Sequence, residues 1–286
     1  MEITAWFGKI DQEAGPFIHA AGETEGMIEA LLESRGKACP IPQPDLRSLA
    51  KACGYTANDS EYNSRLREVA MGLVHRQLMA LATAEQDLLQ AVEALDDLFS
   101  AVNLLDERLY EWSRLHRQEI IHGKDLAEIL CEDEIMGALA RAVLNLREAR
   151  NNMEKEVSAS VENLAPNLSC MAGSVLAARL ISRAGSLRRL AKMPSSSVQI
   201  MGAEKSLFKH LNGHAPSPKH GIIYRHPAVI GAPKRLRGKV ARTLSGKLAI
   251  AARLDYFGQG LSPDLMKTLE KRLTDIRIKG RSSRKS

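Results

Sequence analysis

Two long runs of apolar residues at helical spacing constrain the fold of this chain more than any other feature. The first run has a three-to-four spacing, with Glu85 as the one polar residue in its seam, and consists of Leu78, Leu81, Leu88, Val92, Leu95, Phe99, Val102 and Leu109. Additional leucines at 89, 98 and 105 widen the stripe, so we expect this helix to contact more than one neighbour.

The second run repeats the same spacing through Ile135, Leu139, Ala142, Leu146, Ala149, Met153 and Val157. The sequence HGKD, around Gly123, separates the two runs, which predicts a long antiparallel coiled-coil hairpin over residues 71–162. Extended apolar hairpins often pair with a second copy. We therefore expect a homodimer, with an interface formed by Leu81, Leu88, Val92, Leu95, Phe99, Val102, Leu139 and Leu146. The alternative is a hairpin folded back on its own chain as an ordinary bundle.

Charge is distributed very unevenly along the chain. Residues 163–286 contain 24 Lys and Arg against 5 Asp and Glu, a net charge of +19, whereas residues 1–162 contain 16 against 29, a net charge of −13. Such polarity indicates that the basic part faces a polyanion, and that the acidic part faces protein or solvent. A membrane surface is the competing polyanion, but no helix pattern here combines a basic face with a Trp, Phe and Leu face.

The first 70 residues are expected to form a small α/β module. The segments ITAWFG (3–8) and GPFIHA (15–20) are strand candidates, and GMIEALLESRG (26–36) is a predicted helix that Gly36 stops. CPIPQP (39–44) is a breaker, and PDLRSLAKACGY (44–55) predicts a short helix that ends at Gly54. A module of this size is better suited to docking a partner than to forming an active-site cleft.

An all-helical domain is expected over residues 163–280, beginning at NLAP (163–166) and followed by a basic tail, 281–286. Helix patterns cover 171–194, the end of 194–211, 237–258 and 262–280, and a strand-like apolar run lies within KHGIIYRHP (219–227). The predicted fold class is therefore mainly α: a small α/β module, a long antiparallel hairpin and a helical C-terminal domain.

The sequence provides little support for catalysis. His220 and His226 lie near each other, but the basic part has few carboxylates to orient an imidazole, and GxSxG, HExxH, P-loop and GxGxxG motifs are absent. The four cysteines form no CxxC pair, so we interpret them as reduced thiols and expect no metal site. There is no signal-peptide pattern, and CMAGSVLAARLI (170–181) is too short for a membrane span, so we expect a cytoplasmic protein.

Nucleic-acid binding fits the basic part better. Seven of the 24 residues from 219 to 242 are Lys or Arg, and the segment has no acid. With the preceding helix, the cations are Lys205, Lys209, Lys219, Arg225, Lys234, Arg235, Arg237, Lys239 and Arg242, enough for several phosphate contacts. Two alternatives remain: the cations form an ordinary solvated face, and Phe208 and Leu211 belong to a core.

Five segments of the basic part together resemble the Nop domain in order and spacing. They are AGSLRRLA (184–191), PSSSVQIMGAEKSLFKHL (194–211), KHGIIYRHP (219–227), APKRLRGKVAR (232–242) and KLAIAARLDYF (247–257). AVNLLDERLYEWSRLHRQE (101–119) is similar to the hairpin of the same proteins. Family members often have Gln where this chain has Arg225, so a positive charge is gained at that position.

The resemblance is to archaeal Nop-domain proteins of the Nop56/Nop58 family, and it implies a non-catalytic scaffold of the box C/D small ribonucleoprotein that guides 2′-O-methylation of rRNA. In that family the N-terminal module docks fibrillarin, the methyltransferase that binds S-adenosylmethionine, so no cofactor is expected in the scaffold. The hairpin makes a homodimer, and the Nop domain binds box C/D guide RNA together with the kink-turn-binding protein. The alternatives are a splicing-type Nop-domain RNA-binding protein and, more distantly, a self-contained RNA-modifying enzyme.

Carried over residue by residue, the resemblance predicts one composite surface for RNA and the kink-turn protein. It consists of Gly202, Ala203, Glu204, Lys205, Lys209, His210, Lys219, His220, Arg225, His226, Arg235, Arg237, Lys239 and Arg242.

Overall fold

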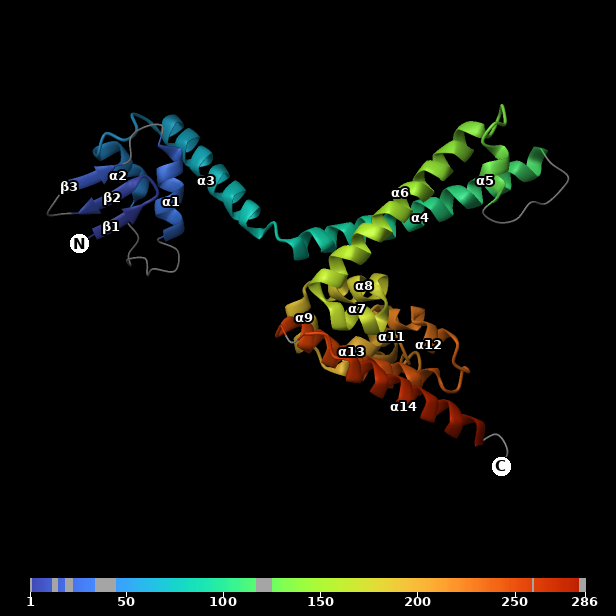
Figure 1. Ribbon diagram of the computed structural model, residues 1–286. Helices are drawn as coiled ribbons and strands as arrows, with labels where there is room; N and C mark the ends of the chain where they lie inside the picture. The colour runs from blue at the N-terminus through green and yellow to red at the C-terminus, as the bar shows by residue number, and fades with distance from the viewer. Residues whose placement is uncertain are drawn as a thin grey trace. The chain divides into compact units, whose positions relative to one another are not determined.

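The computed structural model describes residues 2–11, 15–18, 23–33, 45–116, 125–258 and 260–282. The chain forms two compact units, Met1–Thr83 and Ala84–Ser286 (Figure 1). The described part is mainly helical, which confirms the predicted fold class. The expected divisions at residues 70 and 162 stay predictions.

Three strands in the described part of the first unit form an antiparallel sheet in the order β1-β2-β3. The elements of this unit are β1 (Glu2–Ala5), β2 (Gly8–Asp11), β3 (Gly15–Ile18), α1 (Thr24–Glu33), α2 (Leu46–Ala52) and α3 (Asp59–Leu81). The predicted strand over 3–8 is wrong in its second half, because β1 ends at Ala5 and Trp6 and Phe7 form the turn into β2. Side chains alternate across a strand, so an extended chain could not place both neighbouring rings in one core.

The aromatic rings of this turn hold the first unit together. Trp6 donates its indole N–H to the Tyr62 hydroxyl at 3.0 Å and meets the ring of Tyr55 edge-on at 5.5 Å. Phe7 stacks on Tyr55 at 5.1 Å and is fully buried. The β1–β2 turn is therefore packed against Tyr55, which precedes α3, and Tyr62, which lies in its first turn.

The helices predicted for this unit are present, with shifted ends. α1 begins at Thr24, whereas its expected stop at Gly36 and the breaker at 39–44 lie outside the described residues. α2 is capped by the Asp45 carboxylate, which accepts the N–H groups of Arg47 and Ser48. Gly54 follows with φ +73°, the left-handed conformation that glycine adopts without strain.

The first apolar run is not one helix. α3 ends at Leu81 and α4 begins at Ala84, and the boundary between the two compact units falls at the break. Leu78 and Leu81, which the spacing places in the hairpin seam, belong to the first unit and are 60% and 63% exposed. The spacing cannot reveal this break, since a two-residue interruption leaves the apolar positions close to helical register.

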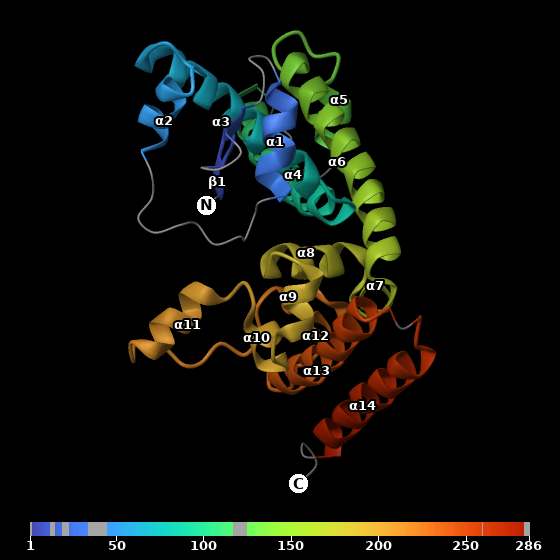
Figure 2. The same ribbon diagram turned by 90° about the vertical axis from the view of Figure 1, so that its left-hand side faces the viewer.

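The second unit contains the predicted hairpin, made of α4 (Ala84–His116) and α6 (Gly137–Leu164), which run side by side in both views (Figures 1 and 2). A short helix, α5 (Asp125–Leu130), packs at the distal end against both of them. The buried side chains there include Leu109, Leu130 and Met136. Most of the predicted turn around Gly123 lies outside the described residues.

The rest of this unit is a helical head (Figure 2). Its elements are α7 (Pro166–Ala172), α8 (Ser174–Ala184), α9 (Leu187–Lys192), α10 (Ser195–Ile200), α11 (Glu204–Leu211), the 3-10 helix η1 (Ile222–Arg225), α12 (Pro227–Ile230), α13 (Arg237–Tyr256) and α14 (Pro263–Ser282). One core joins the head to the proximal half of the hairpin, including Val92, Val157, Ile181 and Leu244. The predicted strand within 219–227 is wrong, because this segment forms η1 and the start of α12.

Candidate nucleic-acid interface

Helix α11 projects its side chains to solvent, although its sequence is amphipathic. None of its residues is buried, and Phe208 and Leu211 are 66% and 72% exposed. The alternative that these two residues belong to a core is therefore wrong. Lys205, Lys209 and His210 are also exposed, so α11 presents apolar and cationic groups together.

The turn before α11 depends on glycine. Gly202 has φ +83°, and a Cβ on it would lie 2.4 Å from Cγ2 of Ile222. Its N–H donates to Oε1 of Glu204 at 2.7 Å. Hydrogen bonds from the backbone N–H groups of Glu204 and Gly202 hold the pKa of the Glu204 carboxyl below its usual range. Glu204 therefore stabilises the start of α11 as an ionised carboxylate.

The segment from Lys219 to Ile222 is held against the end of α10 by main-chain hydrogen bonds. The N–H groups of Gly221 and Ile222 donate to the carbonyls of Gln199 and Met201, each at 2.8 Å. A Cβ on Gly221 would lie only 1.9 Å from the Met201 carbonyl oxygen. Close backbone contact thus fixes this segment next to the turn that starts α11.

Two predicted site residues, His220 and Arg237, form a stack of planar groups with Tyr224. His220 lies on Tyr224 at 4.7 Å with 22° between the rings, and the Arg237 guanidinium lies 5.3 Å from the centre of the Tyr224 ring. Arg237 also donates to the carbonyl of Ala232 at 3.1 Å. Burial, with Arg237 nearby, lowers the pKa of His220 below its usual value. Arg237 thus acts on its own fold, whereas His220 is only partly buried.

His226 has both ring nitrogens in hydrogen bonds within the head. Nδ1 accepts the N–H of Ala228 at 3.1 Å, so the proton lies on Nε2, which donates to the Met171 carbonyl at 3.1 Å. Burial lowers the pKa of His226, which favours this neutral form. His226 is therefore the cap of α12 and has no ring nitrogen left to act as a base.

The remaining predicted cations differ in their surroundings from Arg237. The exposed ones lie on α11, in η1, in the loops before η1 and after α12, and at the start of α13; they are Lys205, Lys209, Lys219, Arg225, Arg235, Lys239 and Arg242. The structure thus places the cations on consecutive elements of the head, and it leaves them accessible to a large anionic ligand.

The residues expected to form a dimer interface are mostly engaged within the chain. Leu88, Val92, Leu95 and Val102 are each no more than 2% exposed, so they are core residues and could not contact a second copy. Phe99, Leu139 and Leu146 are half-buried. Leu81 is exposed, on α3. For the four buried residues the prediction is wrong, because the apolar seam of α4 is covered by α6 and α8 of the same chain.

Sequence reasoning missed the charged junction between hairpin and head. Arg179 of α8 donates from Nε and Nη2 to Oδ1 of Asp96 on α4, at 2.8 and 2.5 Å. Its guanidinium also lies 5.5 Å from the ring centre of Phe99, and Arg150 lies 5.2 Å from the same ring. The available signal was Arg179 itself, a cation in the middle of the apolar run CMAGSVLAARLI (170–181).

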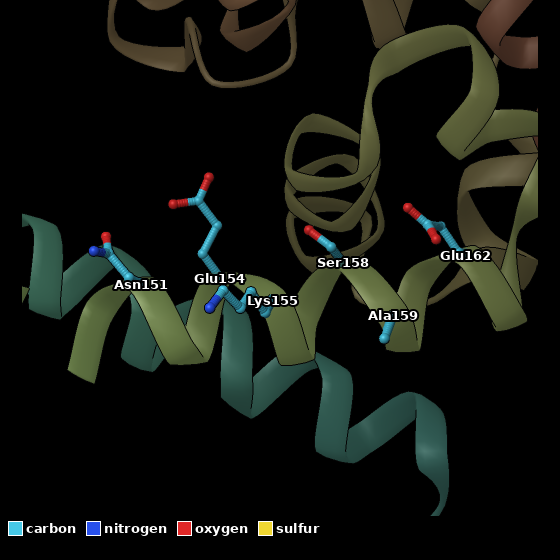
Figure 3. A pocket seen from close by; sticks show the side chains of 6 residues that line it. All are labelled: Asn151, Glu154, Lys155, Ser158, Ala159 and Glu162. Atoms are coloured by element: carbon cyan, nitrogen blue, oxygen red, sulfur yellow. The ribbon is translucent and has the colours of Figure 1, made fainter. Parts of the chain in front are cut away.

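An open depression lies along one face of α6 (Figure 3). Its volume is about 610 Å³, and its lining residues are Asn151, Glu154, Lys155, Ser158, Ala159 and Glu162. They come from successive turns of a single helix, and Glu162 accepts the Ser174 hydroxyl at 2.6 Å. In the described part of the chain, no other element contributes a lining residue, so this face does not bring together the polar groups from several elements that an active site needs.

The described residues lack two further features that would bear on function. No cluster of His, Cys, Asp and Glu side chains suitable for a metal ion occurs among them. Within the same residues, no helix has the length and apolarity needed to cross a bilayer.

Comparison with known proteins places the site in a family context. The family model described as "snoRNA binding domain, fibrillarin" (Nop) matches residues 60–275. An uncharacterized NOP5 family protein of Methanocaldococcus jannaschii is 34% identical over 280 residues, which cover 82% of this chain and 68% of that protein. A chain from the crystal structure of a fibrillarin/Nop5p complex matches with a TM-score of 0.53 and 28% identity, covering 96% of this chain and 100% of that one.

Eukaryotic nucleolar proteins are also similar over part of their length. Nucleolar protein 56 of Dictyostelium discoideum is 42% identical over 140 residues, 49% of this chain and 26% of that protein. Nucleolar protein 58 of Candida albicans is 41% identical over 133 residues, 46% of this chain and 26% of that protein. The matched part therefore spans about a quarter of each nucleolar relative.

Proposed function

The chain belongs to the Nop family of snoRNA-binding domains, and we propose that it is the non-catalytic scaffold of an archaeal box C/D ribonucleoprotein. In this role it bridges fibrillarin to guide RNA that already carries the kink-turn-binding protein, for 2′-O-methylation of rRNA. S-adenosylmethionine is bound by fibrillarin, and the scaffold works in the cytoplasm. The likeness to a chain of a fibrillarin/Nop5p complex supports the fibrillarin partner.

The observation that carries this proposal is the exposure of helix α11. Phe208 and Leu211 are unburied on the same short helix as Lys205 and Lys209. Apolar side chains at the surface favour contact with protein, and the lysines favour contact with phosphate. A helix with both groups fits a surface made jointly by RNA and a bound protein better than it fits naked RNA.

Reconstitution from purified components tests the proposal. The full chain is immobilised and offered fibrillarin, the kink-turn protein and a box C/D guide RNA, with each component omitted in turn. We expect fibrillarin to be retained without RNA, and guide RNA to be retained strongly only when the kink-turn protein is present. Equal retention of naked and protein-loaded RNA would contradict the composite surface. Methyl transfer by the chain alone would contradict the non-catalytic role and support the enzyme alternative.

We further propose that the scaffold is a homodimer through the distal half of the hairpin. Support comes from large apolar residues that are exposed there: Leu104, Leu115, Ile129 and Ile135. Light scattering of the full chain at micromolar concentration checks this, with Leu104→Ser combined with Leu115→Ser as the variant. A monomeric wild-type protein contradicts the proposal, whereas a dimer that the double variant disrupts supports it.

A splicing-type scaffold remains the second candidate, since it would share the Nop domain. The pull-down separates the two roles. Retention of fibrillarin supports the methylation scaffold, and loss of fibrillarin with retention of a kink-turn RNA–protein complex supports the splicing type.

A further inference from the structure

A small pocket lies where the hairpin meets the head, within the second compact unit. Its volume is about 50 Å³, room for a few water molecules or the oxygens of one tetrahedral anion. Helix α4 contributes Val92 and Asp96, α8 contributes Arg179, Ser182 and Arg183, and η1 contributes Ile222 and Arg225. The pocket therefore joins three elements that are separated along the chain.

The charges in the lining are unbalanced. Asp96 is its one acid, and Asp96 is bound by Arg179, so that pair is electrically neutral. Arg183 and Arg225 are exposed, and neither has a hydrogen bond or an ion pair with any of the described residues. The lining therefore carries a net charge of about +2, and its two unpaired guanidinium groups repel each other across the pocket.

A further carboxylate, that of Glu204, lies close enough to Arg183 to feel its charge but is engaged elsewhere. Glu204 feels the charge of Arg183, but its Oε1 accepts the Gly202 N–H at 2.7 Å and stabilises the start of α11. Among the residues that the structure describes, the two guanidinium groups thus have no ion-pair partner of their own. An external anion would remove the repulsion and accept their N–H groups.

The chemistry of the lining favours phosphate over a carboxylate. Each guanidinium offers a planar fork of N–H donors, which matches two oxygens of a phosphate group. Ser182 adds a hydroxyl to the same pocket. A phosphate can accept from both forks and the hydroxyl at once, whereas a carboxylate has only two oxygens to share among them.

We propose that Arg183, Arg225 and Ser182 hold one backbone phosphate of the bound RNA at this junction. The inference rests on the proposed RNA-binding function and extends it to a part of the surface outside α11 and α13. It also gives Arg225 a role: together with Arg183 of α8 it holds a single phosphate between the head and the hairpin.

Salt-dependent binding of kink-turn RNA loaded with its protein tests the proposal with the full chain. The variants are Arg183→Gln, Arg225→Gln and the double variant. The matched control is Arg272→Gln, an exposed arginine on α14, a helix that packs on α13 away from the pocket. Loss of one phosphate contact lowers the slope of log K against log salt by about 0.9 and weakens binding about eightfold at 0.1 M salt.

The double variant provides the decisive measurement. A phosphate shared by two arginines predicts that the double variant lowers the slope by about one contact and no more. Each single variant should lower it by that amount or less, because the other guanidinium still binds the phosphate. A loss of about two contacts in the double variant would mean two separate phosphates and would overturn the shared pocket. Unchanged slopes in all three variants, with the wild type binding RNA normally, would overturn the pocket while the proposed function stands.

A second arm distinguishes RNA backbone from free phosphate. The melting temperature of the full chain is measured in about 20 mM inorganic phosphate and in chloride of the same ionic strength. We expect phosphate to raise the melting temperature of the wild type and of Arg272→Gln. It should not raise that of Arg183→Gln, Arg225→Gln or the double variant. Stabilisation by phosphate with no change in the RNA slopes would assign the pocket to free phosphate and overturn the RNA assignment. Wild-type protein that fails to bind loaded RNA would instead contradict the proposed function itself.

Discussion

Asp255, near the end of α13, caps the first turn of α7, where Asn167 lies 88 positions earlier in the chain. Its Oδ1 accepts the backbone N–H of Asn167 at 2.9 Å and the side-chain amide of Asn167 at 2.8 Å, and its Oδ2 accepts the N–H of Leu168 at 2.8 Å. The Asn167 amide oxygen accepts the N–H of Ser262 at 2.8 Å. One buried asparagine and one carboxylate thus join α7, α13 and the chain leading to α14.

Replacing Asp255 should destabilise the head. Asp255→Asn removes the negative charge from the α7 N-terminus and leaves at most one acceptor for three donors, so we expect a loss of about 1–2 kcal/mol in the free energy of unfolding. Urea denaturation followed by circular dichroism measures it. Asp264→Asn is the matched control. The Asp264 side chain is 91% exposed, and its ion pair with Lys267 is long, at 3.9 Å. A loss as large in the control would show that the capping role is wrong.

Replacing the cation of the Arg179–Asp96 ion pair, which joins α8 to α4, should lower the stability of the fold. Arg179→Lys keeps the charge but loses the second donor to Asp96 and the planar contact with Phe99, and only 12% of the Arg179 side chain is exposed. We expect the free energy of unfolding to fall by about 1 kcal/mol. The loss is no larger because the Asp96 side chain is 41% exposed and solvent screens the pair. The exposed pair Arg108–Glu111 gives the comparison: Arg108→Lys should change stability by less than about 0.5 kcal/mol. Equal effects of the two substitutions would argue against a junction role.

Glu85 shows what could and could not be predicted from the sequence. Helical spacing predicts the hairpin, and it identifies Glu85 as a polar residue in an apolar seam. It does not reveal the reason, since Oε1 of Glu85 accepts the N–H of Leu187 at 2.5 Å, 102 positions away, at the start of α9. Local pattern determines which segments become helices, but such partners are set by tertiary packing.

The same distinction applies to the candidate site. The charge pattern predicts the cations of the head, and most of them are exposed. The pattern does not distinguish Arg237, which bonds to its own backbone, from Arg225, which does not. Likewise, the apolar spacing of Phe208 and Leu211 predicts burial on one face, yet α11 has no neighbour in the described structure that buries them.

Two glycines in the head should respond in opposite ways to the same substitution. Gly221→Ala would place a Cβ 1.9 Å from the Met201 carbonyl oxygen, so the backbone must shift, and we expect a loss of more than about 2 kcal/mol. Gly246→Ala lies within α13 with no atom within 4 Å of the added Cβ, and we expect a gain of about 0.5–1 kcal/mol from helix propensity. Thermal or urea unfolding of both variants checks the pair. A neutral Gly221→Ala would contradict the close backbone contact.

Acid should weaken the fold through His226. Because burial lowers its pKa in the folded state, the unfolded chain binds a proton more readily as pH falls through the ordinary value of 6.5. The free energy of unfolding should therefore decline from pH 7 towards pH 5. His220, whose pKa burial also lowers, adds to the decline with the same sign. His226→Asn keeps an acceptor for the Ala228 N–H and removes the titration, so its decline should be shallower.

The control for this titration is His214→Asn, which changes an exposed histidine of the α11–η1 loop. Its stability should follow the wild-type pH dependence. Urea unfolding at several pH values measures all three proteins. A decline in His226→Asn as steep as in the wild type would show that the protonation of His226 does not govern acid sensitivity.

Partner binding should depend on α11 without any effect on stability. Phe208→Ser and Leu211→Ser change side chains that are 66% and 72% exposed, so we expect melting temperatures close to that of the wild type. If these side chains insert into the surface of the kink-turn protein, each change should weaken binding to protein-loaded RNA about tenfold or more. Phe257→Ser is the matched control, since Phe257 is 71% exposed at the end of α13, outside α11. Isothermal titration of the three variants measures the effect. Equal weakening by all three would assign it to a general loss of apolar surface, whereas selective weakening by the α11 variants supports the docking role.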